Sequence, residues 1–352
     1  ALIFYFFFPN VFENMSYVFA IAVLIGGFVQ FLYQMPFVKK LGFTFKPYFN
    51  FRDIYVIKMI KLFAPGIFGA SVYQINLLVS TAFAGAIGEG RVSAVTFANR
   101  IHEFVLGVFA VSIATVMLPT LSKLLVDGKK EEAKETLGYS LRLVALITVP
   151  ATFGFIILGK EIVETIFQYG AFSSNSTFLV SSALRYLSLS LFFVASYRIV
   201  VQSFYAMKDM KTPVYTAFFS FIINALSNYL CVYIFRFDII GISISSVSAN
   251  IISFCILYIL LMKKIKTKSI IDKKIDIFKT FLSSLLMGMF VFSLKYYFLS
   301  VPQFSKAFFV LKVFIIIFAG IIFYCIINMI LKNNDFLSFI NIFRKKIIKK
   351  KL

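Results

Sequence analysis

Several residue types are scarce in this 352-residue chain, and each scarcity argues against a class of function. The chain has no Trp, one His and three Cys, and the cysteines Cys231, Cys255 and Cys325 lie in separate apolar runs. They have neither CxxC spacing nor a neighbouring His, so we interpret them as small apolar residues rather than metal ligands. The P-loop, GxSxG and HExxH motifs are absent as well, which argues against the common enzyme classes that depend on them.

Charge is also scarce, because only 14% of the residues are charged while 60% are hydrophobic. One soluble core of this size could not hide so much apolar surface. Apolar runs of about 20 residues separate the charged clusters, and this length crosses a hydrocarbon core of roughly 30 Å. The sequence therefore predicts an all-α polytopic membrane protein. The net charge is +21, but the basic residues cluster beside the predicted spans and not on a soluble module, so no nucleic-acid partner is expected.

Nine complete spans are predicted, and they follow an apolar run at 1–8 that is too short to cross. Because the chain starts inside this run, without Met or a signal peptide, we expect an N-terminal portion to be missing. The longest Lys-rich connections divide the spans into the end of an N-terminal lobe at 1–38, a six-helix lobe at 39–262, and two more helices with a basic tail at 263–352. The spans are expected at 16–38, 62–87, 92–121, 138–159, 177–206, 213–235, 240–262, 278–299 and 307–331.

Connections rich in Lys and Arg alternate along the chain with connections that have few of them. This alternation predicts how the chain is oriented in the membrane. The Lys-rich connections and the C-terminus are assigned to the cytoplasmic side of a bacterial inner membrane. The poor connections hold only Arg91, Lys160, Arg236, Lys295 and Lys306. The terminal run 344–351 is expected to lie on anionic headgroups.

Ionisable residues inside spans point to function, because each costs at least about 2.5–3.5 kcal/mol at mid-membrane. Arg100 and Glu103 share one face of the 92–121 span, next to Asn99. They could form an ion pair between helices, or line a watered cavity in which Arg100 binds an anionic substrate. His102, the single histidine, is interpreted as a packing residue rather than a proton relay.

Other polar positions in the spans need partners from elsewhere. Arg198 has no carboxylate at helical spacing in its own span and requires a neighbouring helix or a watered cavity. Asn224 and Asn228 share a face, as do Asn76 and Ser80, which predicts hydrogen bonds between helices or part of a cation site. The charges nearer span ends are expected to reach the membrane surface; they are Arg142, Arg185 and Lys312.

Four stretches resemble the MurJ/MviN family of flippases in their order along the chain. The stretch at 69–76, GASVYQIN, is similar to the start of the family's seventh helix, and the stretch at 103–122 resembles its eighth. FQYGAF at 167–172 is similar to an outer-loop motif, and KTPV at 211–214 resembles the connection between the tenth and eleventh helices. The resemblance covers about 39–262 and weakens in the last two spans.

The resemblance implies a two-lobe flippase/exporter fold, of which this chain would hold helices six to fourteen and the end of helix five. It implies transport of lipid II, the undecaprenyl-diphosphate-linked cell-wall precursor, to the outer leaflet by alternating access through a cationic cavity. Arg100, Glu103, Asn99 and Arg198 then become the candidate substrate-binding residues. Ser80 stands where many relatives have an Asp that is associated with a sodium site. This difference argues against sodium coupling through a cation site at Ser80, Asn224 and Asn228.

Two competing hypotheses remain at this stage. An exporter of another lipid-linked oligosaccharide or of drugs would share the fold, whereas an enzyme acting on prenyl phosphates would need acidic residues at a membrane face. A transporter without a cofactor is favoured, coupled to the membrane potential or to a monovalent cation. The expected partners are lipid II, membrane lipids and, as candidates, proteins of cell-wall synthesis.

Overall fold

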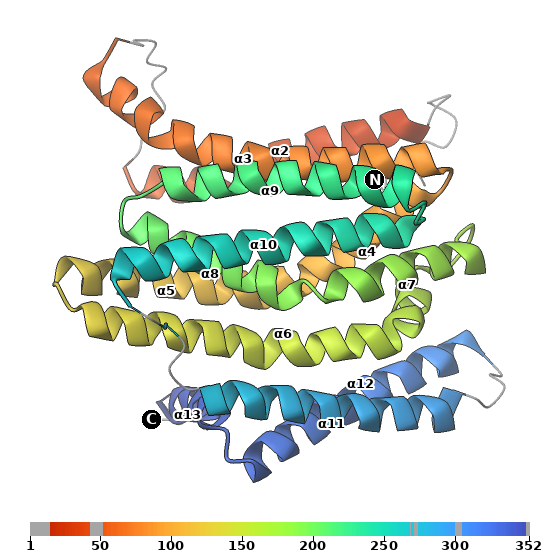
Figure 1. Ribbon diagram of the computed structural model, residues 1–352. Helices are drawn as coiled ribbons and strands as arrows, with labels where there is room; N and C mark the ends of the chain where they lie inside the picture. The colour runs from red at the N-terminus through yellow and green to blue at the C-terminus, as the bar shows by residue number, and fades with distance from the viewer. Residues whose placement is uncertain (1–14, 43–51, 268, 271–273, 300–304, 350–352) are drawn as a thin grey trace. The chain divides into compact units, whose positions relative to one another are not determined.

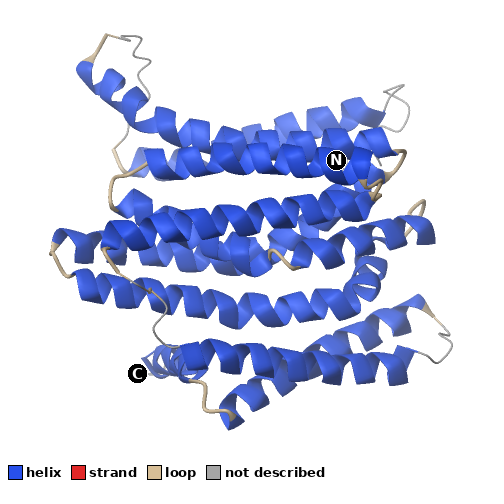
Figure 2. Cartoon of the chain, viewed as in Figure 1, coloured by secondary structure: helices blue, strands red, loops and turns tan. Residues whose placement is uncertain are grey.

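The computed structural model describes residues 15–42, 52–267, 269–270, 274–299 and 305–349, which form helices joined by turns (Figure 2). The chain divides into two compact units, residues 1–60 and 61–352. In the first unit, α2 (Met15–Lys40) is apolar and ends on Lys39 and Lys40. Its described side chains are mostly exposed within this chain.

The second unit is a bundle of long helices, drawn in Figure 1. Helix α3 (Ile54–Ile87) enters it from the first unit. The helices that follow are α4 (Arg91–Val105), α5 (Val111–Val126), α6 (Lys130–Phe167), α7 (Ser174–Ser188), α8 (Leu191–Ala206), α9 (Lys211–Tyr229), α10 (Ile239–Ile265), α11 (Lys274–Leu299), α12 (Lys306–Ile330) and α13 (Asn334–Lys349).

Helix α6 links two apolar cores. On one side it packs against α5, α7 and α8, and the larger core lies mainly among helices α4 to α8 and α10. On the other side it packs against α11, which in turn packs on α12, and a smaller core including Leu158, Met287 and Ile316 fills this contact. Helices α11 and α12 therefore attach to the rest of the second unit through α6 (Figure 1).

Three spans depart from regular α-helix. One π turn, Leu106–Ala110, joins α4 to α5, and another, Leu230–Ile234, ends α9. Helices α7 and α8 form one span bent by 52°. At this bend the Thr152 hydroxyl of α6 donates to the Ser188 carbonyl at 2.9 Å, which satisfies a backbone group freed by the break.

Seven of the nine predicted spans are confirmed by helices of membrane-crossing length within the described residues, and the predicted span 177–206 corresponds to the bent α7–α8 pair. The remaining one, 62–87, falls in α3, where only part of the side chains is described. The expectation that Arg142 reaches the membrane surface is wrong. Its side chain is 6% exposed and its Nε lies 2.9 Å from Oδ2 of Asp335, because the segment after α12 folds back as α13 against α6.

Candidate functional site

A polar cavity of about 90 Å³ lies among the helices of the second unit. Helices α3, α4, α9 and α10 supply most of its lining, and the bent α7–α8 span contributes Leu187 and Val194. Its polar groups are Asn76, Ser80, Asn99, His102, Glu103, Ser220, Asn224, Ser246 and Asn250. A polar cavity bounded by apolar spans is where an ionisable group can remain solvated inside a membrane.

Glu103 on α4 forms its ion pair with Arg198 on α8. Nη2 of Arg198 donates to both carboxylate oxygens, at 2.9 Å to Oε1 and 2.8 Å to Oε2. The two side chains are 38% and 26% exposed, so the pair sits at the edge of the cavity rather than deep in the core. Of the two alternatives for Arg198, a partner from another helix or a watered cavity, the structure shows the partner, Glu103.

Arg100 is placed differently from Glu103 although the two lie three residues apart. The Arg100 side chain is exposed and does not line the cavity, whereas the neighbouring Asn99 does. Among the described residues no carboxylate lies within salt-bridge distance of Arg100. The interpretation of Arg100 and Glu103 as an ion pair between helices is therefore replaced by the pair of Glu103 with Arg198.

His102 supports the bend in the neighbouring span. It is 4% exposed, and its Nε2 lies 3.3 Å from Oγ of Ser190, the residue just before α8. The Ser190 hydroxyl also donates to the Leu187 carbonyl at 2.7 Å. These contacts agree with the packing interpretation of His102.

The three residues of the suggested cation site do come together. Ser80 on α3 donates to Oδ1 of Asn224 at 3.2 Å, and Nδ2 of Asn228 donates to the same oxygen at 2.9 Å and to Ser80 Oγ at 3.4 Å. Asn228 is fully buried and its Oδ1 has no hydrogen-bond partner. The neighbouring Asn76 Oδ1 is likewise buried and unpaired.

This neutral cluster fits a cation poorly. Two of its three side-chain oxygens already accept hydrogen bonds within the cluster, and both of these bonds come from the Asn228 amide nitrogen, which is a donor and not a cation ligand. Neither a carboxylate nor a ring nitrogen belongs to the cluster. Across the described part of the chain, no group of three or more His, Cys, Asp or Glu side chains comes together.

Ion pairs hold the two ends of the bundle. At the end with few lysines, Nε and Nη2 of Arg91 bind the Asp238 carboxylate at 3.1 and 3.0 Å, and this hydrogen bonding keeps the pKa of Asp238 below its usual range. At the Lys-rich end, Asp209 binds Lys264 and Thr212. Burial alone would raise the pKa of Asp209, but these hydrogen bonds outweigh it and lower the pKa to about 2.

Sequence reasoning missed part of the cavity lining, namely Ser220 on α9 with Ser246 and Asn250 on α10. Small polar residues are common inside membrane helices and hydrogen-bond between helices or to their own backbone, so single serines gave no distinct signal. Asn250 could have been singled out, because an amide inside an apolar span requires polar surroundings.

Comparison with known proteins places this architecture in a family. The model of the family "Lipid II flippase MurJ" matches residues 1–320. A probable lipid II flippase MurJ of Haemophilus influenzae is 32% identical over 321 residues, which cover 88% of this chain and 62% of that protein. This chain therefore spans about three fifths of the length of that relative.

Solved structures agree with this assignment. A lipid II flippase MurJ in an inward closed conformation matches with a TM-score of 0.63 and 27% identity, covering 81% of this chain and 57% of the other. An outward-facing multidrug transporter of the MATE family shares the fold alone, with a TM-score of 0.53 and 15% identity over 82% of this chain and 68% of the other. The sequence match, the helical architecture and this structural likeness together show that the chain belongs to the MurJ family of lipid II flippases.

Proposed function

We propose that this chain, together with the segments that its relatives have beyond it, moves lipid II from the inner to the outer leaflet of the bacterial cytoplasmic membrane. The family membership supports the substrate. The observation that carries the proposal is the polar cavity with the Glu103–Arg198 pair at its edge, because a charged headgroup crosses about 30 Å of hydrocarbon only through a polar, watered path.

Arg100 is the residue proposed to bind the diphosphate. Its planar guanidinium can hold two phosphate oxygens at once. Arg198 neutralises Glu103, so the acidic charge nearest to Arg100 in the sequence does not compete with the substrate. Asn99, which lines the cavity next to Arg100, is proposed to contact the headgroup as a neutral donor.

The Lys-rich ends of the spans are proposed to face the cytoplasm, and the C-terminus lies on the same side. The positive-inside rule supports this orientation, since short connections decide it. An anion that moves outward then goes downhill in an inside-negative potential by about 2.3 kcal/mol per charge per 100 mV.

The membrane potential is proposed as the coupling force. The neutral hydrogen-bonded cluster of Ser80, Asn224 and Asn228 supports this choice over a cation, since it contains no carboxylate and two of its three side-chain oxygens already accept hydrogen bonds within it. Rocking of one lobe against the other would expose the cavity to each leaflet in turn while the prenyl tail stays in lipid. No covalent step is required, so the protein acts as a transporter.

Complementation of a bacterium depleted of its own flippase tests the proposal. The full-length gene is expected to restore growth, and Arg100→Ala is expected to abolish the rescue while the protein still inserts into the membrane. Arg236→Gly is the matched control, because Arg236 is an exposed arginine with φ 52°, a conformation that glycine adopts readily. Failure of the well-expressed wild-type gene would instead indicate another lipid-linked substrate or a drug.

A further inference from the structure

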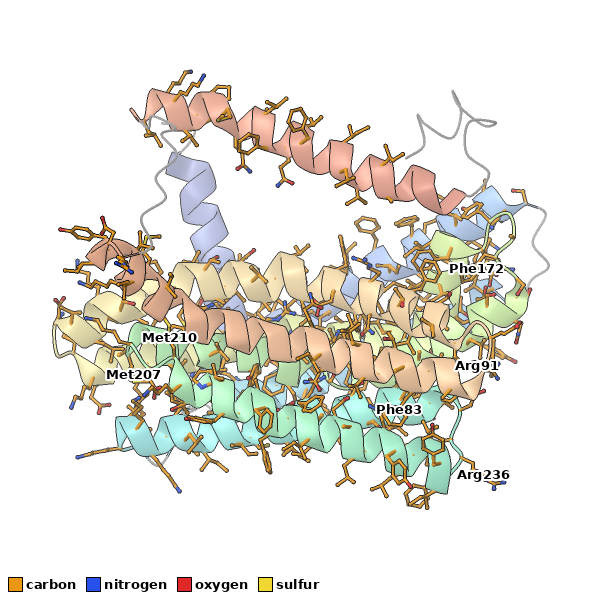
Figure 3. The ribbon with its side chains drawn as sticks, turned by 90° about the horizontal axis from the view of Figure 1, so that it is seen from above. Phe83, Arg91, Phe172, Met207, Met210 and Arg236 are labelled. Atoms are coloured by element: carbon orange, nitrogen blue, oxygen red, sulfur yellow. The ribbon has the colours of Figure 1, made fainter. Side chains whose placement is uncertain are left out.

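A second cavity, of about 130 Å³, lies at the Lys-rich end of the second unit. The ends of α5, α8 and α10 and the start of α6 enclose it. Figure 3 labels Met207, one of its lining residues, at the opposite end of the helices from Arg91 and Arg236. Its polar lining consists of Lys130, Ser203, Lys264 and Lys266, and residues such as Leu125 and Met207 make the rest apolar.

Lys264 is held in place and its charge is largely balanced. It forms an ion pair with Asp209, and its Nζ lies 5.4 Å from the centre of the Phe204 ring. Asp209 is itself fixed by the Thr212 backbone N–H at 3.1 Å. This end of α10 is thereby tied to the turn between α8 and α9, which gives the cavity a defined wall.

Lys130 and Lys266 differ from Lys264 in their charged neighbours. In the described part of the chain, neither lysine has a carboxylate within 4 Å. The acidic residues beside Lys130 are turned to other lysines, since Glu132 pairs with Lys129 at 3.0 Å and Glu131 lies 3.9 Å from Lys134. Two lysines that have no carboxylate partner among the described residues therefore line one partly apolar cavity.

The backbone conformation at Lys266 favours glycine over lysine. Lys266 ends α10 with φ 58° and ψ 42°, the left-handed conformation that glycine and asparagine adopt most easily. A lysine is less favourable than a glycine in this conformation, because its Cβ approaches the following carbonyl oxygen. The contribution of Lys266 is therefore its side chain, which lines the cavity.

The first turn of α6 adds to the positive potential. The residue before it, Lys129, makes no side-chain cap hydrogen bond, and Lys130 and Ala133 of this turn line the cavity. The partial positive charge of a helix N-terminus favours an anion at that end.

We propose that this cavity binds the phosphate of an anionic glycerophospholipid, with Lys130 and Lys266 on the headgroup and an acyl chain along the apolar wall. The chemistry of the lining matches both parts of such a lipid. The cavity lies where spans end, which is the level of the headgroups, and basic pockets between helices on the cytoplasmic side suit anionic lipids. The site is separate from the polar cavity and does not depend on the transported substrate.

Native mass spectrometry of the purified protein tests the proposal by titration with dioleoylphosphatidylglycerol. The variant Lys130→Gln/Lys266→Gly is expected to weaken the first lipid adduct about 30-fold, since each lysine near an anionic lipid is worth about 1 kcal/mol. Glycine at 266 keeps the left-handed conformation, so the fold is expected to persist, and a thermal melt checks this.

The matched control is Lys263→Gln/Lys332→Gly, which removes two charges from exposed lysines outside the cavity, one of them with φ 48°. The control is expected to retain the adduct within about threefold of wild type. Equal weakening by both double variants would overturn the proposal, as would equal affinity for dioleoylphosphatidylcholine. Displacement of the lipid by an equal concentration of inorganic phosphate would also overturn it and assign the cavity to a soluble phosphate.

Discussion

Arg198 binds both carboxylate oxygens of Glu103 through a single nitrogen, Nη2, across two neighbouring spans. The pair joins α4, which carries Arg100, to α8, which follows the bend in its span. Glu103 is thus neutralised by a residue far along the chain, and the proposed phosphate ligand keeps its charge for the substrate.

Removing only one member of this pair is expected to impair transport more than removing both. Arg198→Met leaves the Glu103 carboxylate without its guanidinium, at a cost of about 1–3 kcal/mol, and adds repulsion toward an anionic headgroup. Transport should fall at least about tenfold, whereas Glu103→Gln/Arg198→Met should recover most of it. Flipping assays in vesicles with the full-length protein give the comparison, and a double variant as inactive as Arg198→Met would show that Arg198 binds substrate directly.

The buried pair of Arg142 with Asp335 is expected to dominate the attachment of α13. Both side chains are at most 6% exposed, so Asp335→Asn leaves a buried guanidinium and should lower the free energy of unfolding by about 3–5 kcal/mol. Thermal melts in detergent measure the loss. Glu132→Gln breaks the pair of Lys129 with Glu132, which is more than half exposed, and should cost at most about 1 kcal/mol. A similar loss in both variants would contradict the argument from burial.

Stability at acid pH is expected to depend on Asp209. Its pKa is lowered from its ordinary value of 3.8 to about 2 in the folded protein, so the carboxylate binds a proton less readily when the protein is folded. The stabilisation is therefore complete above about pH 4 and disappears as the pH falls toward 2. Asp209→Asn should be less stable than wild type at neutral pH, and this difference should shrink between pH 4 and 2. A difference that stays constant over this range would contradict the assignment.

Sodium is expected to have little effect on the stability of this chain, because the cluster of Ser80, Asn224 and Asn228 offers only neutral oxygens. Melting temperatures in sodium and in potassium chloride should agree within about 1 °C, since a ligand stabilises only when it binds the folded state. Ser80→Asp/Asn228→Asp places two carboxylates at these positions and should make the melting temperature rise with sodium. A sodium-dependent melting temperature in the wild-type protein would contradict the fit argued here.

Much of the fold could be predicted from apolar length alone, as seven of the nine expected spans illustrate. The bend between α7 and α8 could not be predicted, because no Pro or Gly marks Leu189 and Ser190. The helix α13 was also missed, since the basic run at 344–351 suggested a tail on the membrane surface. A Thr152 hydroxyl from another helix supports the bend, and a buried Asp335 anchors α13, so both features depend on partners distant in sequence.

The sequence by itself determined which residues are polar inside the spans and which connections are rich in lysine. Both follow from composition and position, because a membrane requires long apolar runs and makes each buried charge costly. Only the tertiary structure decided that Glu103 pairs with Arg198, that Ser80 meets Asn224 and Asn228, and that Arg142 is buried. Helical periodicity identifies neighbours three or four residues apart, whereas contacts between helices depend on how the helices pack.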